Sequence, residues 1–175
     1  MQGIELIDHL AQIILLAHGW HKVARVAESL DSRQGHSIFP VKEYSSKTLP
    51  ADIEFAFERL KELDGGQDAN IYTQAITSLK SVFARLEKDE EGKENPHAAL
   101  DWVITLPEQF VGLMKARKEI ALVILGFYSV VLDQVAQVWW LRGWSRDLFG
   151  VVWSLVNSLH RDVLRWPQEI IKFES

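Results

Sequence analysis

The feature that most constrains the fold is an uncharged run of thirteen residues, 120–132. An apolar stretch with no polar face needs burial on every side. It is also shorter than the roughly 20 residues that a membrane-spanning helix requires. We therefore expect no membrane span, and a buried central helix over residues 119–141 that leads into a cluster of tryptophans.

Five of the seven tryptophans lie between positions 139 and 166. Helical spacing places apolar residues after position 139 on one face: Trp140, Trp144, Leu148, Val151 or Val152, Leu155 and Leu159. Such a stripe is typical of core packing, which is the favoured interpretation. The alternative is a ligand cavity, because large rings leave gaps between them and an indole N–H can donate to a ligand.

Helical spacing of apolar residues recurs along the chain, whereas strand-like alternation is hard to find. It predicts helices over 3–30, 50–63, 68–88, 119–141 and 144–159, and others starting at 96 and 107. Gly143 predicts a bend, and the pair Trp166-Pro167 predicts an end of regular structure. We expect one all-α domain over 1–175, an irregular bundle of about six to eight helices.

Charge and cysteine content exclude several classes of function. The chain has 19 Lys and Arg against 24 Asp and Glu, and no basic cluster that could hold phosphates, so we expect no nucleic-acid contact. Without cysteine there is no disulfide and no thiolate metal site, which favours a reducing compartment, the cytoplasm or nucleus. Glu5 and Asp8 stand where a secretion signal would be basic.

No catalytic or cofactor motif is present, so we expect no cofactor and no metal. His18 and His21 have metal-ligand spacing, but no third ligand follows at a suitable offset, which favours a structural or solvent-facing pair. Asp133 interrupts the apolar run. It pairs with a neighbour or reaches solvent in the simplest interpretation. In an enzyme, it could act with Tyr128 or His18.

Four motifs in residues 98–168 carry a resemblance to a known family. Their matching residues are Trp102, Leu106, Pro107 and Phe110, then the run 121–125 with Tyr128, then Trp139, Trp140, Leu141, Gly143 and Trp144, and finally Trp166 and Pro167. This pattern resembles the C-terminal region of fungal zinc-cluster transcription factors similar to sterol uptake control proteins. The chain departs from it at Glu119, Gly126 and Phe127, where the family usually has Pro, Ala and His. It also has no cysteine for the DNA-reading zinc cluster.

The resemblance implies an all-helical regulatory domain that senses a hydrophobic, sterol-like ligand and forms a homodimer. The expected ligand-binding residues are Leu122, Leu125, Tyr128, Leu132, Trp140 and Trp144. The alternative is a small stand-alone enzyme of fungal secondary metabolism, a cyclase or isomerase acting on a hydrophobic intermediate through Asp133, Tyr128 and His18. A third interpretation is a structural dimerisation domain with no cavity.

Overall fold

The computed structural model describes residues 2–30, 49–63, 65–86, 96–136 and 143–174, and these residues contain no strand. Nine α-helices and one short 3-10 turn occur in them. Their bounds are α1 Gln2–Leu30, α2 Ala51–Lys61, η1 Gly66–Asp68, α3 Ala69–Leu86, α4 Pro96–Thr105, α5 Glu108–Lys115, α6 Glu119–Gln134, α7 Trp144–Leu155, α8 Ser158–Arg161 and α9 Arg165–Ile171. The all-α prediction is confirmed.

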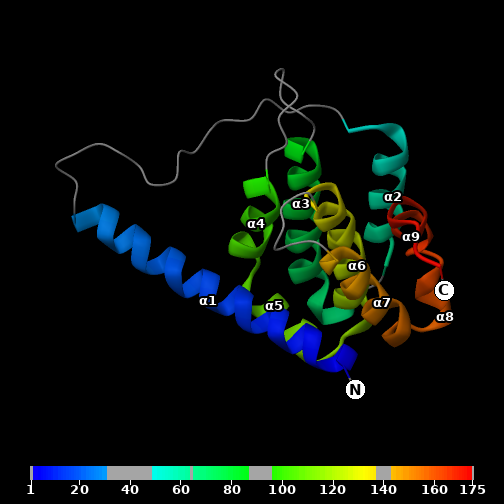
Figure 1. Ribbon diagram of the computed structural model, residues 1–175, viewed down its shortest axis with the longest axis horizontal. Coiled ribbons are helices and arrows are strands. Elements are labelled where there is room, and N and C mark those ends of the chain that lie inside the picture. Colours follow the sequence, from blue (N-terminus) through cyan, green and yellow to red (C-terminus); the bar gives the residue numbers. More distant parts are fainter. Residues whose placement is uncertain (1, 31–48, 64, 87–95, 137–142, 175) are drawn as a thin grey trace.

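Helix α6 is the centre of the bundle, as the uncharged run predicts. Every residue from 121 to 132 is buried. Helices α3, α5, α7, α8 and α9 all contact it (Figure 1). Burying the whole circumference of one helix in this way removes a large apolar surface from water, which stabilises the fold.

The predicted end of this central helix is wrong, because α6 stops at Gln134 and not at position 141. The hydroxyl of Ser145 at the start of α7 donates to the Asp133 carboxylate at 2.9 Å. A helix continuing to position 141 would carry the chain about 10 Å further on, at 1.5 Å per residue. The early end therefore lets α7 return along α6. Residues 137–142, between α6 and α7, lie outside the described residues.

The predicted helix 144–159 is two helices. Helix α7 ends at Leu155, Val156 is extended, and Asn157 caps α8 by accepting the His160 N–H at 3.0 Å. The Glu119 carboxylate accepts from both the backbone and the side-chain amide of Asn157. These contacts fix the break, and they explain why Leu159 is 76% exposed and does not continue the buried stripe.

The predicted stop at Trp166-Pro167 is also wrong, because both residues lie inside α9. Pro167 occupies the first turn, where a helix has no internal partner for its N–H groups. Proline at this position therefore removes no hydrogen bond of the helix. The helix ends at Ile171, and the residue that follows it, Lys172, has a left-handed φ of 54°.

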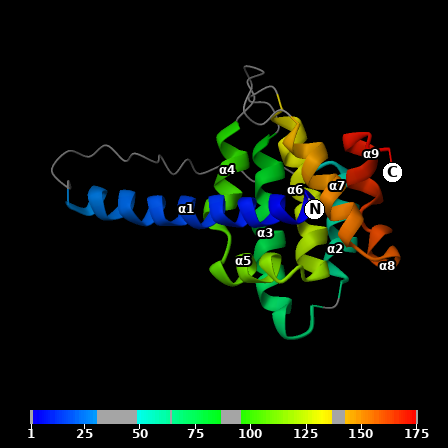
Figure 2. The ribbon, with the colours of Figure 1, turned by 60° about the horizontal axis from the view of Figure 1, so that its bottom comes forward.

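Helix α1 runs alongside the bundle and then leaves it. The predicted long helix is confirmed, and Ile7, Leu10, Ala11 and Ile14 face inward. It packs against α4, α5 and α7. The last buried side chain described on it is His18, and beyond that point the helix projects away from the body (Figures 1 and 2).

Helices α2 and α3 cover another side of α6. Of the two phenylalanines that could face inward on α2, Phe57 is fully buried with Leu60, whereas Phe55 is 67% exposed. The stripe predicted on α3 is buried at Ala75, Leu79, Phe83 and Leu86. The loop predicted at 31–50 lies outside the described residues up to position 48. In the part of the chain that is described, no helix combines the length and apolarity needed to cross a bilayer.

Candidate functional site

The expected ligand wall on α6 lies inside the packed core. Leu122, Leu125, Tyr128 and Leu132 are each at most 2% exposed. Trp144, at the start of α7, is partly buried and packs against the same core. Trp140 lies outside the described residues. The structure thus brings these four α6 residues together as core residues, each in contact with protein.

Rings fill the space beside Tyr128. Its ring lies against that of Trp102, with centroids 4.4 Å apart, and Trp102 makes an edge contact with Phe110 at 6.1 Å. The Tyr128 hydroxyl donates to the Ala99 carbonyl at 3.0 Å, and the Trp102 indole donates to the Ala75 carbonyl at 3.1 Å. Burial raises the pKa of the Tyr128 phenol well above its usual value. These rings are therefore locked by packing and by hydrogen bonds.

His18 has a structural partner at the end of α4. Its Nε2 lies 2.9 Å from the carbonyl oxygen of Val103. In a helix that oxygen would accept from the residue four positions later, but that residue is Pro107, which has no N–H. A carbonyl only accepts, so Nε2 carries the proton and donates. His18 thus satisfies a carbonyl that the α4 sequence leaves without its helical partner.

The three residues named for a catalytic role do not meet at one point. Tyr128 and His18 both bind carbonyls of α4, one turn apart, at Ala99 and Val103. Asp133 instead accepts from Ser145 on α7. The side chain of His21 is not among those described. Among the described residues, no group of three His, Asp or Glu side chains is placed to hold a metal ion.

The described residues do form a groove elsewhere, between α2 and the α8–α9 corner, with a volume of about 240 Å³. We call it the α2–α9 groove. Its apolar lining comes from Phe55, Ala56, Val163 and Trp166. Its charged lining comes from Asp52, Arg59, Asp162, Arg165 and Glu169.

The charges at the rim of the α2–α9 groove are only partly paired. Arg165 binds Asp162 at 3.1 Å. Asp52 accepts from the indole nitrogen of Trp166 at 3.4 Å. Arg59 has no ion pair or hydrogen bond with any described residue. The rim therefore offers one guanidinium that can donate to a group outside the chain.

Trp166 connects this groove to the core. Its ring lies 5.6 Å from that of Phe127 on α6 and 5.9 Å from that of Phe83 on α3. Phe57 makes edge contacts with both phenylalanines, at 5.5 and 5.3 Å. A molecule in the groove would thus touch a ring that belongs to the aromatic core.

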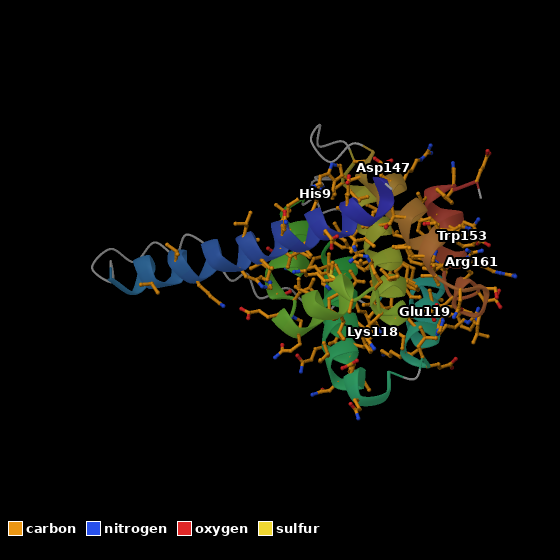
Figure 3. All side chains as sticks on the ribbon, turned by 90° about the horizontal axis from the view of Figure 1, so that it is seen from below. His9, Lys118, Glu119, Asp147, Trp153 and Arg161 are labelled. Atoms are coloured by element: carbon orange, nitrogen blue, oxygen red, sulfur yellow. The ribbon has the colours of Figure 1, made fainter. Side chains whose placement is uncertain are left out.

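A different aromatic contact lies at the C-terminal end of α7, between α7 and α8. The guanidinium of Arg161 lies 5.3 Å from the ring centre of Trp153, and the two side chains lie close together in Figure 3. Nearby, His160 Nδ1 is 3.0 Å from the Glu119 carboxylate. Arg161 also donates to the Val156 carbonyl at 3.1 Å. These groups are satisfied by one another, so we assign them to holding α8 in place.

Sequence reasoning missed the groove. Trp166-Pro167 predicted a stop, so nothing suggested that Trp166 would face a neighbouring helix. The exposed Phe55 was one of two alternatives on α2, and that ambiguity was the only available signal. Comparison with protein-family models, with curated proteins and with solved structures finds no match to this chain.

Proposed function

We propose that the chain is a non-catalytic regulatory domain that binds a small apolar molecule in the α2–α9 groove. The observation that carries this proposal is the position of Trp166, which lines the groove and also contacts Phe127 of the central helix. The resemblance to the regulatory region of fungal zinc-cluster transcription factors supports the same class of function. On this view the domain acts in the nucleus or cytoplasm, with no zinc cluster of its own.

The size of the groove narrows the class of ligand. Its volume of about 240 Å³ is below the 300–1,000 Å³ that is usual for drug-sized ligands. A sterol-like molecule would place only one end of its ring system inside. The ligand we propose therefore inserts one or two apolar rings between Phe55 and Trp166.

Arg59 supplies the polar part of the recognition. Its guanidinium is exposed, lines the groove and has no partner among the described residues. Charge-assisted hydrogen bonds from arginine are stronger than neutral ones. We therefore expect the ring system to carry an oxygen acceptor, a hydroxyl or a carboxylate, near the mouth of the groove.

Binding in the α2–α9 groove can affect the packing of the rest of the bundle through Trp166. Contacts to Trp166 would stabilise its packing against Phe127 of α6 and Phe83 of α3, because a ligand favours the conformation that it binds more tightly. The α8–α9 corner is then held in one packing against α2. Regulation would follow from the difference between the ligand-bound corner and the free one.

The test is a binding screen read by the thermal midpoint of unfolding and by native mass spectrometry. Probes are a sterol, a terpenoid alcohol and an aromatic carboxylate. We expect at least one to stabilise the protein, and Phe55→Ser to abolish the shift. Arg59→Gln should weaken binding about tenfold, the loss of one charge-assisted hydrogen bond.

Leu159→Ser is the matched control, because Leu159 is exposed to a similar extent, 76% against 67% for Phe55, and does not line the groove. It should leave the ligand shift unchanged. The proposal is wrong if no probe of these three classes binds. It is also wrong if a bound probe is insensitive to both Phe55→Ser and Arg59→Gln.

A further inference from the structure

Charged side chains of both signs border the α2–α9 groove without an ion-pair partner. Arg165 and Asp162 neutralise each other in an ion pair of 3.1 Å. The other three charged residues of the lining, Asp52, Arg59 and Glu169, are exposed and form no ion pair with any described residue. One guanidinium and two carboxylates are therefore left to interact with a molecule outside the chain. The rim has a place for a positive group as well as for a negative one.

The sequence of α2 separates these charges along the groove. The four α2 residues of the lining follow helical spacing and share one face of the helix: Asp52, Phe55, Ala56 and Arg59. At a rise of 1.5 Å per residue, Asp52 and Arg59 start about 10 Å apart along the helix axis. Phe55 and Ala56 lie between them. The groove therefore runs along α2 from an acidic end, past apolar residues, to a basic end.

The acidic end of the groove lies beside Trp166. The indole nitrogen of Trp166 donates to one carboxylate oxygen of Asp52 at 3.4 Å. An ionised carboxylate accepts several hydrogen bonds, so Asp52 can accept from a ligand and keep its contact with Trp166. Glu169 follows Trp166 by three residues on α9, which lies beside α2 in Figure 1. Two carboxylates thus favour a ligand group that donates hydrogen bonds near Trp166.

We propose that the ligand of the α2–α9 groove is bipolar. It is an aromatic ring with a carboxylate at one end, bound by Arg59, and an ammonium group at the opposite end, bound by Asp52. The ring lies between Phe55 and Trp166, which both line the groove. This assignment rests on the proposed function, and it narrows the ligand from any ring with an oxygen acceptor to one chemical class.

The charge of the rim distinguishes this ligand from the simpler ones. A plain aromatic acid would satisfy Arg59, but Asp52 and Glu169 would repel its negative charge. A neutral ring would gain nothing from any of the three. Because these side chains are exposed, each ion pair contributes little, and we expect a preference of about fivefold for each end of the ligand. High salt should reduce that preference, since exposed charges are screened.

The test compares three probes that share one benzene ring. The first, para-(aminomethyl)phenylacetate, carries both charges. The second, para-methylphenylacetate, lacks the ammonium group, and the third, para-methylbenzylamine, lacks the carboxylate. Dissociation constants are measured by ligand-detected NMR titration at low ionic strength. We expect the bipolar probe to bind the wild type about fivefold more tightly than either singly charged probe.

Two variants assign the two ends of the ligand. Asp52→Asn removes a charge but keeps an oxygen that can accept from Trp166, and it should abolish the preference for the bipolar probe over para-methylphenylacetate. Arg59→Gln should abolish its preference over para-methylbenzylamine. Glu58→Gln is the matched control, because Glu58 is an exposed carboxylate of the same helix that does not line the groove. It should leave the order of the three probes unchanged.

The bipolar ligand is rejected if para-methylphenylacetate binds the wild type as tightly as the bipolar probe, or if the preference survives Asp52→Asn. Either result leaves the proposed function standing, because an apolar ring still occupies the groove. The bipolar ligand is also rejected, and the function again stands, if only a sterol or a terpenoid alcohol binds. If no probe of any of these classes binds, the proposed function is wrong as well.

Discussion

Helices α6 and α1 are both rich in apolar residues, yet the bundle uses them in opposite ways. Helix α6 is buried on all sides from 121 to 132. Helix α1 buries one face, at residues such as Ile7 and Ile14, and exposes another, at residues such as Leu16 and Val23. An apolar run without a period indicates the interior. The apolar residues of α1 therefore lie on two faces, of which the bundle covers only one.

The sharpest test of this contrast compares one residue type in both helices. Leu125 on α6 is fully buried, and Leu16 on α1 is 73% exposed. Leu125→Ala should lower the free energy of unfolding by about 2–5 kcal/mol, because it removes buried methyl groups and leaves a cavity. Leu16→Ala should change it by no more than about 0.5 kcal/mol, because this side chain is mostly exposed.

Urea denaturation of the two variants, each compared with the wild type, gives both values. Similar losses for Leu125→Ala and Leu16→Ala would contradict the contrast, because they would place Leu16 in a packed contact within one chain.

A second test probes how tightly α6 is enclosed. A Cβ at Gly126 would lie 2.4 Å from the Leu164 Cδ2 atom and 3.5 Å from a methyl carbon of Val152. Gly126→Ala should therefore destabilise the protein by about 1–3 kcal/mol through overpacking. Gly112→Ala on α5 is the matched control, because a Cβ there meets nothing within 4 Å, and it should be neutral or stabilising.

Position 126 also bears on the resemblance, whose pattern has alanine there. Leu164→Ala should relieve the strain of Gly126→Ala, so the double variant should lose less than the sum of the two single losses. Additive losses, or a harmless Gly126→Ala, would mean that α6 and the α8–α9 corner are packed less closely than the distances indicate.

The periodicity of apolar residues was enough to predict the helices but not the residues at which they end. The burial of α6 follows from its uncharged run, and the long α1 from its three-and-four spacing. The end of α6 depends instead on the Ser145–Asp133 hydrogen bond, and the start of α8 on the Glu119–Asn157 contacts. Each joins residues on different helices, so no local pattern contains it.

The candidate site was harder to predict, for a related reason. Sequence identified the apolar residues of α6 but could not distinguish rings that enclose a cavity from rings that fill one. The difference lies in contacts such as that of Tyr128 with Trp102. Nor could sequence place Trp166 beside Phe55, because this neighbourhood depends on how α9 folds back onto α2.

A third test concerns the bond that holds the middle of α1 to the bundle. His18→Leu replaces the imidazole with an apolar side chain of similar size and leaves the Val103 carbonyl without a donor. An unsatisfied buried carbonyl costs about 1–3 kcal/mol, and we expect a loss in this range in urea denaturation. His9→Leu on the exposed part of the same helix is the control (Figure 3) and should change little. Equal effects would contradict the assigned role of His18.

The smallest expected effect is that of Tyr128→Phe, which removes one hydroxyl from the core beside α6. Its acceptor, the Ala99 carbonyl, is an interior group of α4 and keeps its helical partner, so the loss should be about 1 kcal/mol at neutral pH.

The pH dependence of the stability is a more informative test of Tyr128 than the loss at neutral pH. Burial raises the folded-state pKa of Tyr128, so the unfolded chain releases this proton first, at its ordinary value near 10. The contribution is therefore fully present below that pH and is lost as pH rises above it. Unfolding followed from pH 8 to 11 should show stability falling at the alkaline end. The fall should be shallower in Tyr128→Phe and should not vanish, because burial also raises the pKa of Tyr72. An identical alkaline slope in both proteins would show that the Tyr128 hydroxyl is not sealed inside the core.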